Sequence, residues 1–335
     1  MRTFDDLLCS FSLDLSAPII VGVSYGPDSM ALLHRIWSKG FKNIHVAHVH
    51  HGLRLESDQE ERELCLFCQK LQVPCHVERL SIDISIKNLE DRLRDERHRF
   101  FKKIYEEIGA VALFLGHQAD EQVETGLKRF FEGASHVAMG GMHPSKELFG
   151  MRVCRPQLYE SKAVLLNYLA THQVPFAIDA SNTSEDFLRG KMRVQMVPFL
   201  KGAFGKEFEE NVLRHMEQMS AFTHYLDQKI GPALESVMRG CYGMVLPKAG
   251  IAGLEEVELD HLLIRIGVTR WHTRKRILAH WTKQECAKNV KDSAIHCFVE
   301  KKGIFFLTYK TSTILRKNRY VIEDQGKVIY EFLTL

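Results

Sequence analysis

The sequence predicts an α/β protein: a doubly wound, mostly parallel sheet, followed by a helical linker and a small basic C-terminal domain. Short apolar runs alternate with amphipathic stretches over the first two-thirds of the 335 residues, and polar clusters follow three of the runs. Strands and helices that alternate in this way form a parallel sheet covered by helices on both faces. The composition, with 45% hydrophobic and 26% charged residues, is that of a globular protein, and the length suggests about two domains.

Run length and spacing predict each element in turn. Residues 17–24 form an apolar run of strand length, and residues 30–39 form an amphipathic stretch that Gly40 ends. The strand 43–49 and the helix 56–71 repeat this pair, and apolar residues occupy one face of the second helix. The next pairs are strand 74–80 with helix 89–108, and strand 111–115 with helix 121–131.

The remaining chain has a different pattern. A helix is expected at 163–172, and apolar residues at helical spacing predict a long helix at 212–238. A helical pair and short strands near 304–308 and 327–333 are expected after it. The sequence therefore predicts three parts: a catalytic domain at 1–210, a linking helix at 211–240 and a C-terminal domain at 241–335.

Positive charge is concentrated toward the C-terminal end. Between residues 261 and 320 there are fourteen Lys and Arg and three acidic residues, whereas the whole chain has a net charge of +3. The rest of the chain is therefore acidic, and the basic block predicts a polyanionic partner such as RNA. A solvated basic surface would have the same composition. The RNA-binding candidates in this block are Arg270, Arg274, Lys275, Arg276 and Lys283.

The sequence favours a cytoplasmic protein. Residues 1–16 contain three aspartates and lack the basic and apolar regions of a signal peptide. No apolar run reaches the roughly 18 residues that cross a bilayer. The eight scattered cysteines are expected to be free thiols. Because Cys65-x-x-Cys68 has no matching second pair, a zinc or iron–sulfur site is disfavoured.

The loop between the first strand and its helix carries the strongest chemical signal. Glycine permits a tight turn, while serine hydroxyls and the backbone amides at a helix start attract an anion such as pyrophosphate. Proline suits the first helical turn, where no N–H is needed. The aspartate is placed to reach a metal ion or a polarised substrate. The loop consists of Ser24, Tyr25, Gly26, Pro27, Asp28 and Ser29.

Two further polar clusters follow strand ends, at 48–54 and 117–125. Because the carboxyl ends of parallel strands meet at one edge of a sheet, the three clusters are expected to form one site. The chain has no Walker loop and no G-x-G-x-x-G motif. Gly22-x-Ser24-x-Gly26 matches the nucleophile elbow of α/β-hydrolases. It follows the first strand, where an elbow is unusual, so a hydrolase with a Ser24 nucleophile is the weaker alternative.

Four ordered motifs resemble those of one family. SYGPDS at 24–29 resembles the SGGxDS loop of the N-type ATP pyrophosphatases, or PP-loop proteins. HVHHGLR at 48–54 resembles HVNHGLR, and GHQADEQVET at 116–125 resembles GHHADDQAET. Together with a fourth motif, they make residues 18–200 similar to the tRNA(Ile)-lysidine synthetase family. The fourth motif consists of Asp179-x-Ser-Asn182, Arg189-x-x-x-Arg193 and Val197-Pro198, which together resemble D-x-SN…RNxxR…VPLL.

The chain departs from the family pattern at several positions. Tyr25 replaces a glycine of the loop, which bears on how closely a phosphate can approach. Glu121 replaces an aspartate and keeps its charge. The other departures are His50 and Gly190 in place of asparagines, and Glu132 in place of an arginine.

The resemblance implies a ligase that joins free L-lysine to C2 of the wobble cytidine of an isoleucine tRNA with a CAU anticodon. First the cytosine C2 oxygen attacks the α-phosphate of ATP and pyrophosphate leaves. Then the lysine ε-amine attacks C2 and AMP leaves, which gives lysidine. The resemblance also implies Mg²⁺ with the ATP and a basic C-terminal domain that binds tRNA, and it leaves a homodimer open.

Each part of the implied reaction has candidate residues. The serine-rich loop would hold pyrophosphate with Asp28 at the metal ion, and Arg189 and Arg193 would supply cations. His51 and Arg54, at the second strand end, suit the adenosine. The lysine amine, with a pKa of about 10.4 in water, needs a carboxylate that orients it and accepts a proton. The candidates near lysine and cytidine are His117, Asp120, Glu121 and Glu124.

Two other functions fit parts of the sequence. A PP-loop tRNA thiolase would share the loop, but it would be expected to use paired cysteines. A tRNA-binding protein without catalytic activity would bind RNA with strong salt dependence and consume no nucleotide. Nucleotide consumption therefore separates the enzymes from the binding protein.

Overall fold

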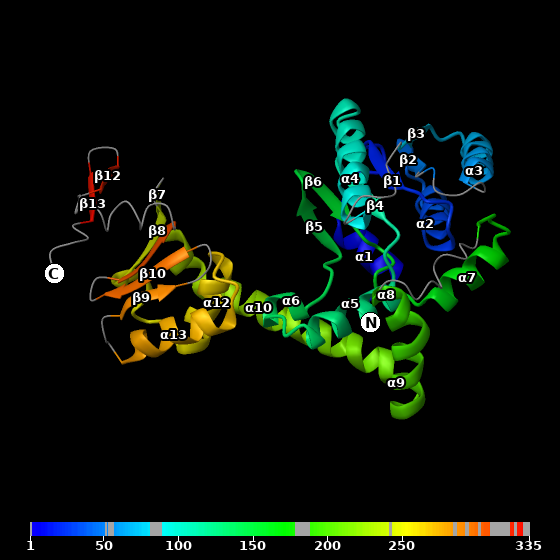
Figure 1. The fold of residues 1–335 in the computed structure, drawn as a ribbon. Helices are drawn as coiled ribbons and strands as arrows, with labels where there is room; N and C mark the ends of the chain where they lie inside the picture. The colour runs from blue at the N-terminus through cyan, green and yellow to red at the C-terminus, as the bar shows by residue number, and fades with distance from the viewer. Residues whose placement is uncertain are drawn as a thin grey trace. The chain divides into compact units, whose positions relative to one another are not determined.

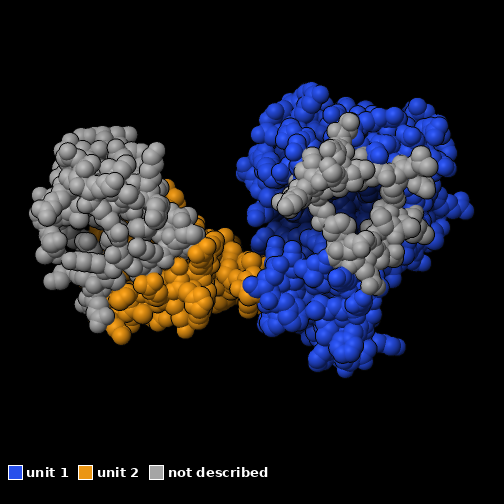
Figure 2. Space-filling view, in the orientation of Figure 1, with its two compact units in different colours: residues 1–132, 140–217 blue, residues 133–139, 218–335 orange. Residues whose placement is uncertain are grey.

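The computed structural model describes residues 2–50, 52, 57–80, 89–177, 188–240, 243–283, 287–291, 295–300, 303–308, 322–324 and 327–330. His51, Arg54 and the motif at 179–182 lie outside the described residues. The chain divides into two compact units, residues 1–132 with 140–217 and residues 133–139 with 218–335 (Figure 2). The three-part division predicted from the sequence stays a prediction.

A six-stranded sheet forms the centre of the first unit, in the order β3-β2-β1-β4-β6-β5 (Figure 1). Neighbouring strands are parallel except for the hairpin of β5 and β6. The predicted doubly wound, mostly parallel α/β fold is therefore confirmed. The strands are β1 (Ile19–Gly22), β2 (Ile44–His50), β3 (Cys75–Arg79), β4 (Ala112–Leu115), β5 (Ser145–Leu148) and β6 (Met151–Cys154).

Helices cover both faces of this sheet because neighbouring strand residues point to opposite sides and are apolar on both. Ile19 and Val21 of β1 belong to the core that contains Leu33 of α2. Ile20, between them, belongs to the core that contains Phe101 of α4. The helices of the unit are α1 (Phe4–Ser10), α2 (Pro27–Ser38), α3 (Ser57–Leu71), α4 (Leu89–Glu107), α5 (Ala119–Phe131), α7 (Lys162–Thr171), α8 (Leu188–Lys191), the π-helical turn Met192–Met196 and α9 (Val197–Phe204).

The chain changes direction across the sheet at β1, which has β2 on one side and β4 on the other. In such sheets, ligands bind in the crevice outside the carboxyl ends of the strands at this point. Gly116 follows β4 and allows the end of this strand to lie against the start of α2. A Cβ at Gly116 would lie 3.0 Å from the carbonyl oxygen of Asp28 and 3.1 Å from the nitrogen of Ser29. The backbone after β4 therefore lies directly against the start of α2.

The second unit is built on a five-stranded antiparallel sheet, in the order β7-β8-β11-β10-β9. Leu262 of α12, Ile277 of α13 and Phe306 of β11 share its buried core. The sequence predicted the helical pair and the strand at 304–308 and missed β7 to β10, because strands of this length show little alternation. Its strands are β7 (Met238–Gly240), β8 (Gly243–Pro247), β9 (Ala287–Lys291), β10 (Ile295–Glu300) and β11 (Gly303–Thr308).

The long helix predicted at 212–238 is α10 (Phe208–Glu235), whose residues fall in both units. The predicted end was wrong, because Met238 begins β7. No helix among the described residues is both long and apolar enough to cross a membrane. The remaining elements are α6 (His136–Met139), α11 (Lys248–Ile251), α12 (Glu256–Arg265), α13 (Trp271–Thr282), and the pair β12 (Ile322–Asp324) and β13 (Lys327–Tyr330).

Candidate active site

The loop after β1 is closed by its two serines. Ser29 Oγ accepts a hydrogen bond from the Ser24 nitrogen at 3.1 Å and donates to the Gly26 carbonyl oxygen at 3.0 Å. Pro27 lies in the first turn of α2, as predicted, and no side chain caps this helix start. The Ser29 proton is thus used within the loop. The Ser24 hydroxyl and the amides at the start of α2 are the groups that can meet an anion.

Tyr25 adopts the backbone conformation that glycine would adopt at this position. Its φ is 64°, in the left-handed region where a side chain causes strain. The ring is 2% exposed, and its hydroxyl donates to Glu63 Oε2 at 2.8 Å. Burial and the Glu63 carboxylate raise the pKa of Tyr25, so the hydroxyl keeps its proton. Packing and this hydrogen bond therefore hold the loop in a conformation that glycine reaches without strain.

We expect Tyr25→Phe to lower the free energy of unfolding by about 1 kcal/mol, because it removes the hydrogen bond and keeps the buried ring. Urea unfolding would measure the change. Glu63→Gln retains an acceptor for the hydroxyl and should cost less. Equal stability of Tyr25→Phe and the natural protein would show that ring packing alone holds the loop.

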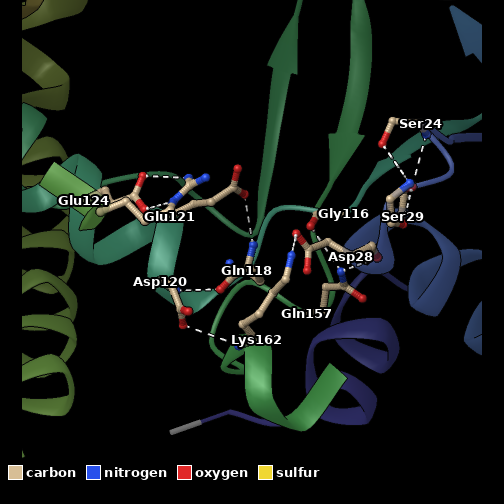
Figure 3. A network of polar contacts seen from close by, with 12 residues as sticks. Ser24, Asp28, Ser29, Gly116, Gln118, Asp120, Glu121, Glu124, Gln157 and Lys162 are labelled. Carbon is tan, nitrogen blue, oxygen red and sulfur yellow. Dashed lines mark hydrogen bonds and ion pairs between the residues drawn. The ribbon is translucent and has the colours of Figure 1, made fainter. Parts of the chain in front are cut away.

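Asp28 contacts a lysine from a distant part of the chain (Figure 3). Lys162, at the start of α7, donates from Nζ to Asp28 Oδ2 at 2.8 Å. Gln157 Nε2 donates to the carbonyl oxygens of Asp28 and Gly116, at 2.8 and 3.1 Å. Asp28 Oδ1 is buried and has no hydrogen-bond partner in the described part of the chain. A buried carboxylate oxygen is costly to leave unpaired, so this atom suits a bound cation or a donor of the substrate.

The start of α5 brings two of the predicted carboxylates beside Asp28. Glu121 Oε2 accepts from the Gln118 nitrogen at 3.3 Å, and Asp120 Oδ1 accepts from the Lys162 nitrogen at 3.4 Å. Burial, together with the negative charge of Asp28, raises the pKa of Glu121 to about 7. Burial also raises the pKa of Asp120. Glu121 can therefore exchange a proton near neutral pH, as a catalytic acid or base must.

Glu124 is used differently from its neighbours. It is 5% exposed and accepts two hydrogen bonds from Arg193, at 2.7 and 3.0 Å. The spacing of Arg189 and Arg193 predicts that the two side chains share one helix face. Instead, α8 ends at Lys191 and Arg193 lies in the π-helical turn. Arg193 neutralises a buried carboxylate, and Arg189 lines neither of the two cavities described next.

Two cavities meet at these residues. The first, of about 190 Å³, extends from the loop after β1 to His117 and also contacts Arg97 of α4. The second, of about 560 Å³, lies against α5, α7 and α9. Asp28 and Glu121 line both cavities. Acidic side chains outnumber basic ones around the second cavity: Asp28, Asp120, Glu121, Glu124 and Glu209 against Lys162, Arg193 and Lys201.

His117 is a neutral hydrogen-bonding group in this site. Its Nδ1 accepts from Arg155 Nε at 3.1 Å. Burial and the charge of Arg155 lower the pKa of His117 to about 3. The imidazole is therefore uncharged at neutral pH and carries its proton on Nε2. It can donate a hydrogen bond to a ligand of the first cavity, but it adds no positive charge for a phosphate.

The structure joins most of the predicted site and adds residues to it. Sequence reasoning missed Lys162, Arg97 and Glu209, none of which lies in a recognisable motif. Within the described residues, Ser24 Oγ forms hydrogen bonds with Ser29 Oγ and with the Gly26 nitrogen. No histidine among the described residues contacts this hydroxyl, which removes the support for a Ser24 hydrolase.

The predicted RNA-binding residues of the second unit do not all lie at the surface. Arg274 is 3% exposed, donates to Asp260 Oδ1 at 2.7 Å and to the Thr269 carbonyl oxygen at 2.6 Å. It therefore joins α12 to α13, and its assignment to an RNA surface was wrong. The side chains exposed around α13 are Arg270, Trp271, His272, Lys275, Arg276 and Lys283, and Lys275 Nζ lies 4.6 Å from the centre of the Trp271 ring.

Comparison with known proteins identifies relatives of the chain. The protein named tRNA(Ile)-lysidine synthase of Chlamydia muridarum is 33% identical over 238 residues, or 70% of this chain and 74% of that protein. The one of Chlamydia trachomatis serovar D is 29% identical over 96% of this chain and 94% of that protein. The Listeria monocytogenes protein named Bifunctional protein TilS/HprT is 36% identical over 61% of this chain. The chain spans only 32% of that longer relative.

The fold is also similar to that of solved structures. The U34-tRNA thiolase NcsA of Methanococcus maripaludis, with its [4Fe-4S] cluster, aligns with a TM-score of 0.52 over 65% of this chain and 77% of that chain. At 13% identity, this likeness concerns the fold alone. The model of the PP-loop domain family matches residues 3–200. The chain therefore belongs to the PP-loop family and, within that family, to the tRNA(Ile)-lysidine synthases.

Proposed function

We propose that this protein joins free L-lysine to C2 of the wobble cytidine of tRNA(Ile) with a CAU anticodon, in a reaction that consumes ATP and passes through an adenylated cytidine. The pair of cavities that share Asp28 and Glu121 carries this proposal. One cavity contains an anion-binding loop, and the other has an excess of carboxylates. A nucleotide-dependent activation, followed by attack of an amine that binds as a cation and then loses its proton, needs both. The names of the relatives support the same reaction.

In the first step, pyrophosphate leaves the ATP, and negative charge must be stabilised on the phosphates. The Ser24 hydroxyl and the amides at the start of α2 would bind them. Arg97 lines this cavity and Lys162 lies beside Asp28, so both are placed to supply positive charge. Arg193 is paired with Glu124 and is better assigned to the second cavity. The roles of His51 and Arg54 at the adenosine stay predictions.

Mg²⁺ is the expected companion of ATP. No three His, Cys, Asp or Glu side chains among the described residues are arranged to hold a metal ion by themselves. Magnesium in nucleotide sites usually needs only one or two carboxylates together with the phosphates. The unpartnered Asp28 Oδ1 fits that requirement. Bound there, the ion would neutralise charge on the phosphates.

In the second step, a lysine ammonium must be bound and then deprotonated. Five carboxylates against three basic side chains leave the second cavity with an excess of negative charge, which favours a cationic ligand over an anionic one. Asp120 would hold the ammonium, and Glu121, whose pKa is raised to about 7, would accept its proton. A carboxylate with that pKa is a stronger base than an ordinary glutamate. Because Glu121 also lines the first cavity, it can reach the base where activation takes place.

The exposed face of α13 would bind the tRNA outside the reaction site. Its basic side chains match the charge of RNA phosphates. Trp271 is 53% exposed, and its ring offers a surface on which bases can stack. We propose that Arg270, Lys275, Arg276 and Lys283 form this surface, without Arg274. The reaction would take place in the cytoplasm, where tRNA is used.

Substitutions at adjacent positions separate the surface role from the structural role. We expect Arg274→Ala to lower the free energy of unfolding by about 3 kcal/mol, because it leaves the Asp260 carboxylate without its partner. Lys275→Ala should change the free energy of unfolding by no more than about 0.5 kcal/mol. It should lower the slope of log K for tRNA binding against log salt concentration by about one. Thermal unfolding and binding titrations at several salt concentrations would measure both. Equal effects of the two substitutions would contradict the assignment.

Transfer of radiolabelled lysine to RNA tests the proposed function. The protein is incubated with labelled lysine, ATP, Mg²⁺ and tRNA(Ile) bearing CAU, and the RNA is then treated with mild alkali. Alkali removes an aminoacyl ester but leaves lysine attached to a nucleobase. ATP-dependent, alkali-stable label that is absent with methionine tRNA is the expected result. ATP consumption without stable label would instead favour tRNA thiolation or another PP-loop reaction.

A further inference from the structure

The segment 188–206 of the first unit carries charge of one sign. It contains five basic residues and no acidic residue. All five are exposed, whereas Met192 between them is buried and anchors the segment against α5. A surface with this charge attracts polyanions. The five residues are Arg189, Lys191, Arg193, Lys201 and Lys206. Arg193 and Lys201 are paired with Glu124 and Glu209, so the other three carry the charge that attracts a polyanion.

Two phenylalanines of α9 are exposed on the same segment. Phe199 is 72% exposed and Phe204 is 74% exposed. The Phe204 ring lies against that of Phe208, with 6.4 Å between their centres. Large apolar side chains gathered on a charged surface are typical of interaction sites. Bases of single-stranded RNA stack on aromatic rings while cations contact the phosphates between them.

The segment also borders the acidic cavity. Val197, Pro198 and Lys201 of α9 line that cavity, and Phe204 lies three residues after Lys201, on a neighbouring part of the helix surface. Arg193 fixes the segment to α5 through its two hydrogen bonds to Glu124. A buried core and an ion pair thus fix the helix that carries the exposed rings along one wall of the candidate active site.

We propose that the segment 188–206 binds the single-stranded loop of the RNA that carries the reacting base, with Phe199 and Phe204 stacking on bases next to it. This inference rests on the proposed function, because it assumes an RNA substrate. An enzyme that modifies a base must hold that base away from its neighbours. The two rings of α9 supply the stacking surface for that arrangement, and Arg189, Lys191 and Lys206 supply the phosphate contacts.

A second copy of the chain fits this surface less well than RNA does. In a two-fold symmetric dimer the same patch meets itself. The positive charges of Arg189, Lys191 and Lys206 would then face their own copies, and the segment has no acidic residue to pair with them. The same charges attract a nucleic acid. The surface is therefore assigned to RNA, and self-association is an outcome that the test below would detect.

Binding of a fluorescently labelled RNA hairpin with a CAU loop tests the proposal, measured by fluorescence anisotropy with the full chain. We expect Phe199→Ala and Phe204→Ala each to weaken binding about 5- to 100-fold, the range that stacking on one base supplies. Phe199→Trp should restore binding, whereas Phe199→Leu should not. A fully paired RNA duplex should bind all variants alike, because its bases are not free to stack.

Phe149→Ala is the matched control. Phe149 is also an exposed phenylalanine of the first unit, at 57%. It lies in the turn before β6, at the edge of the sheet opposite to the carboxyl ends of the parallel strands. This variant should bind the hairpin like the natural protein. Thermal unfolding should be unchanged in all these variants, because each replaced ring is largely exposed.

Three outcomes would overturn the proposal. Hairpin binding could be unchanged in both alanine variants, or duplex binding could fall as much as hairpin binding. In the third, the natural protein sediments as a dimer and the alanine variants sediment as monomers. RNA binding needs neither lysine nor ATP. A hairpin-binding defect of Phe199→Ala would therefore support this surface even if the natural protein formed no lysidine. Conversely, lysidine formation by both variants with an unchanged KM for tRNA would overturn this surface alone.

Discussion

Asp28→Asn is expected to reduce ATP-dependent pyrophosphate release by about 1000-fold or more while leaving tRNA binding unchanged. Asparagine has the size of aspartate but no negative charge. It cannot form the ion pair that Asp28 makes with Lys162, at 2.8 Å, and it offers a cation only a neutral oxygen. Because Asp28 lies between the two cavities, the loss should affect activation of the base before lysine enters the reaction.

Pyrophosphate release in the absence of lysine measures this first step, and a filter-binding titration measures the affinity for tRNA. Asp5→Asn is the matched control, because Asp5 also pairs with a lysine, Lys39, at 2.7 Å, but lies outside both cavities. It should be fully active. An equal loss of tRNA binding and pyrophosphate release in Asp28→Asn would show that Asp28 supports the fold of the site instead.

The sheet could be predicted because the apolar pattern that indicates each strand lies within a few consecutive residues. The run that contains β1 is apolar at every position, which is typical of a strand buried on both faces. Motifs after β1 and β4 then predicted a shared site, since the carboxyl ends of parallel strands meet at one edge. Gly116 shows how close that meeting is: a Cβ there would lie 3.0 Å from the carbonyl oxygen of Asp28, closer than an ordinary contact.

Lys162 could not be assigned to the site from the sequence. It lies 134 residues from Asp28, and its partner is fixed by the packing of α7 against α2. Nothing in the residues around it indicates this contact.

Arg274 was wrongly included in the RNA-binding surface, whereas Lys162 was missed from the active site. Its neighbours Lys275 and Arg276 are exposed, but a residue one position earlier on a helix faces another direction, here the core between α12 and α13.

The largest effect on the second step is expected from Glu121→Gln. Glutamine can still fit the helix start, but it cannot accept a proton from the lysine ammonium. Formation of lysidine from adenylated tRNA should fall about 10²- to 10⁴-fold, the usual contribution of a general base. Pyrophosphate release should change much less. Glu132→Gln, at the other end of α5 and exposed, is the matched control and should be fully active.

The pH dependence separates a base from a structural carboxylate. The pKa of Glu121 is raised to about 7, so its basic form increases as the pH rises through 7, and the second step should accelerate over that range. The Gln variant should lack this inflection.

The stability of the fold depends on pH with the opposite sign. In the folded state Glu121 holds a proton that the unfolded state loses near the ordinary pKa of about 4.5. Glu121 therefore lowers stability as the pH rises from about 4.5 to 7, and Glu121→Gln should unfold at a higher temperature than the natural protein at pH 8. A variant that is slow, lacks the inflection and is more stable would identify Glu121 as a base retained at a cost to the fold. A second step that keeps both its rate and its inflection would assign the proton transfer to another group, with Asp120 the next to replace.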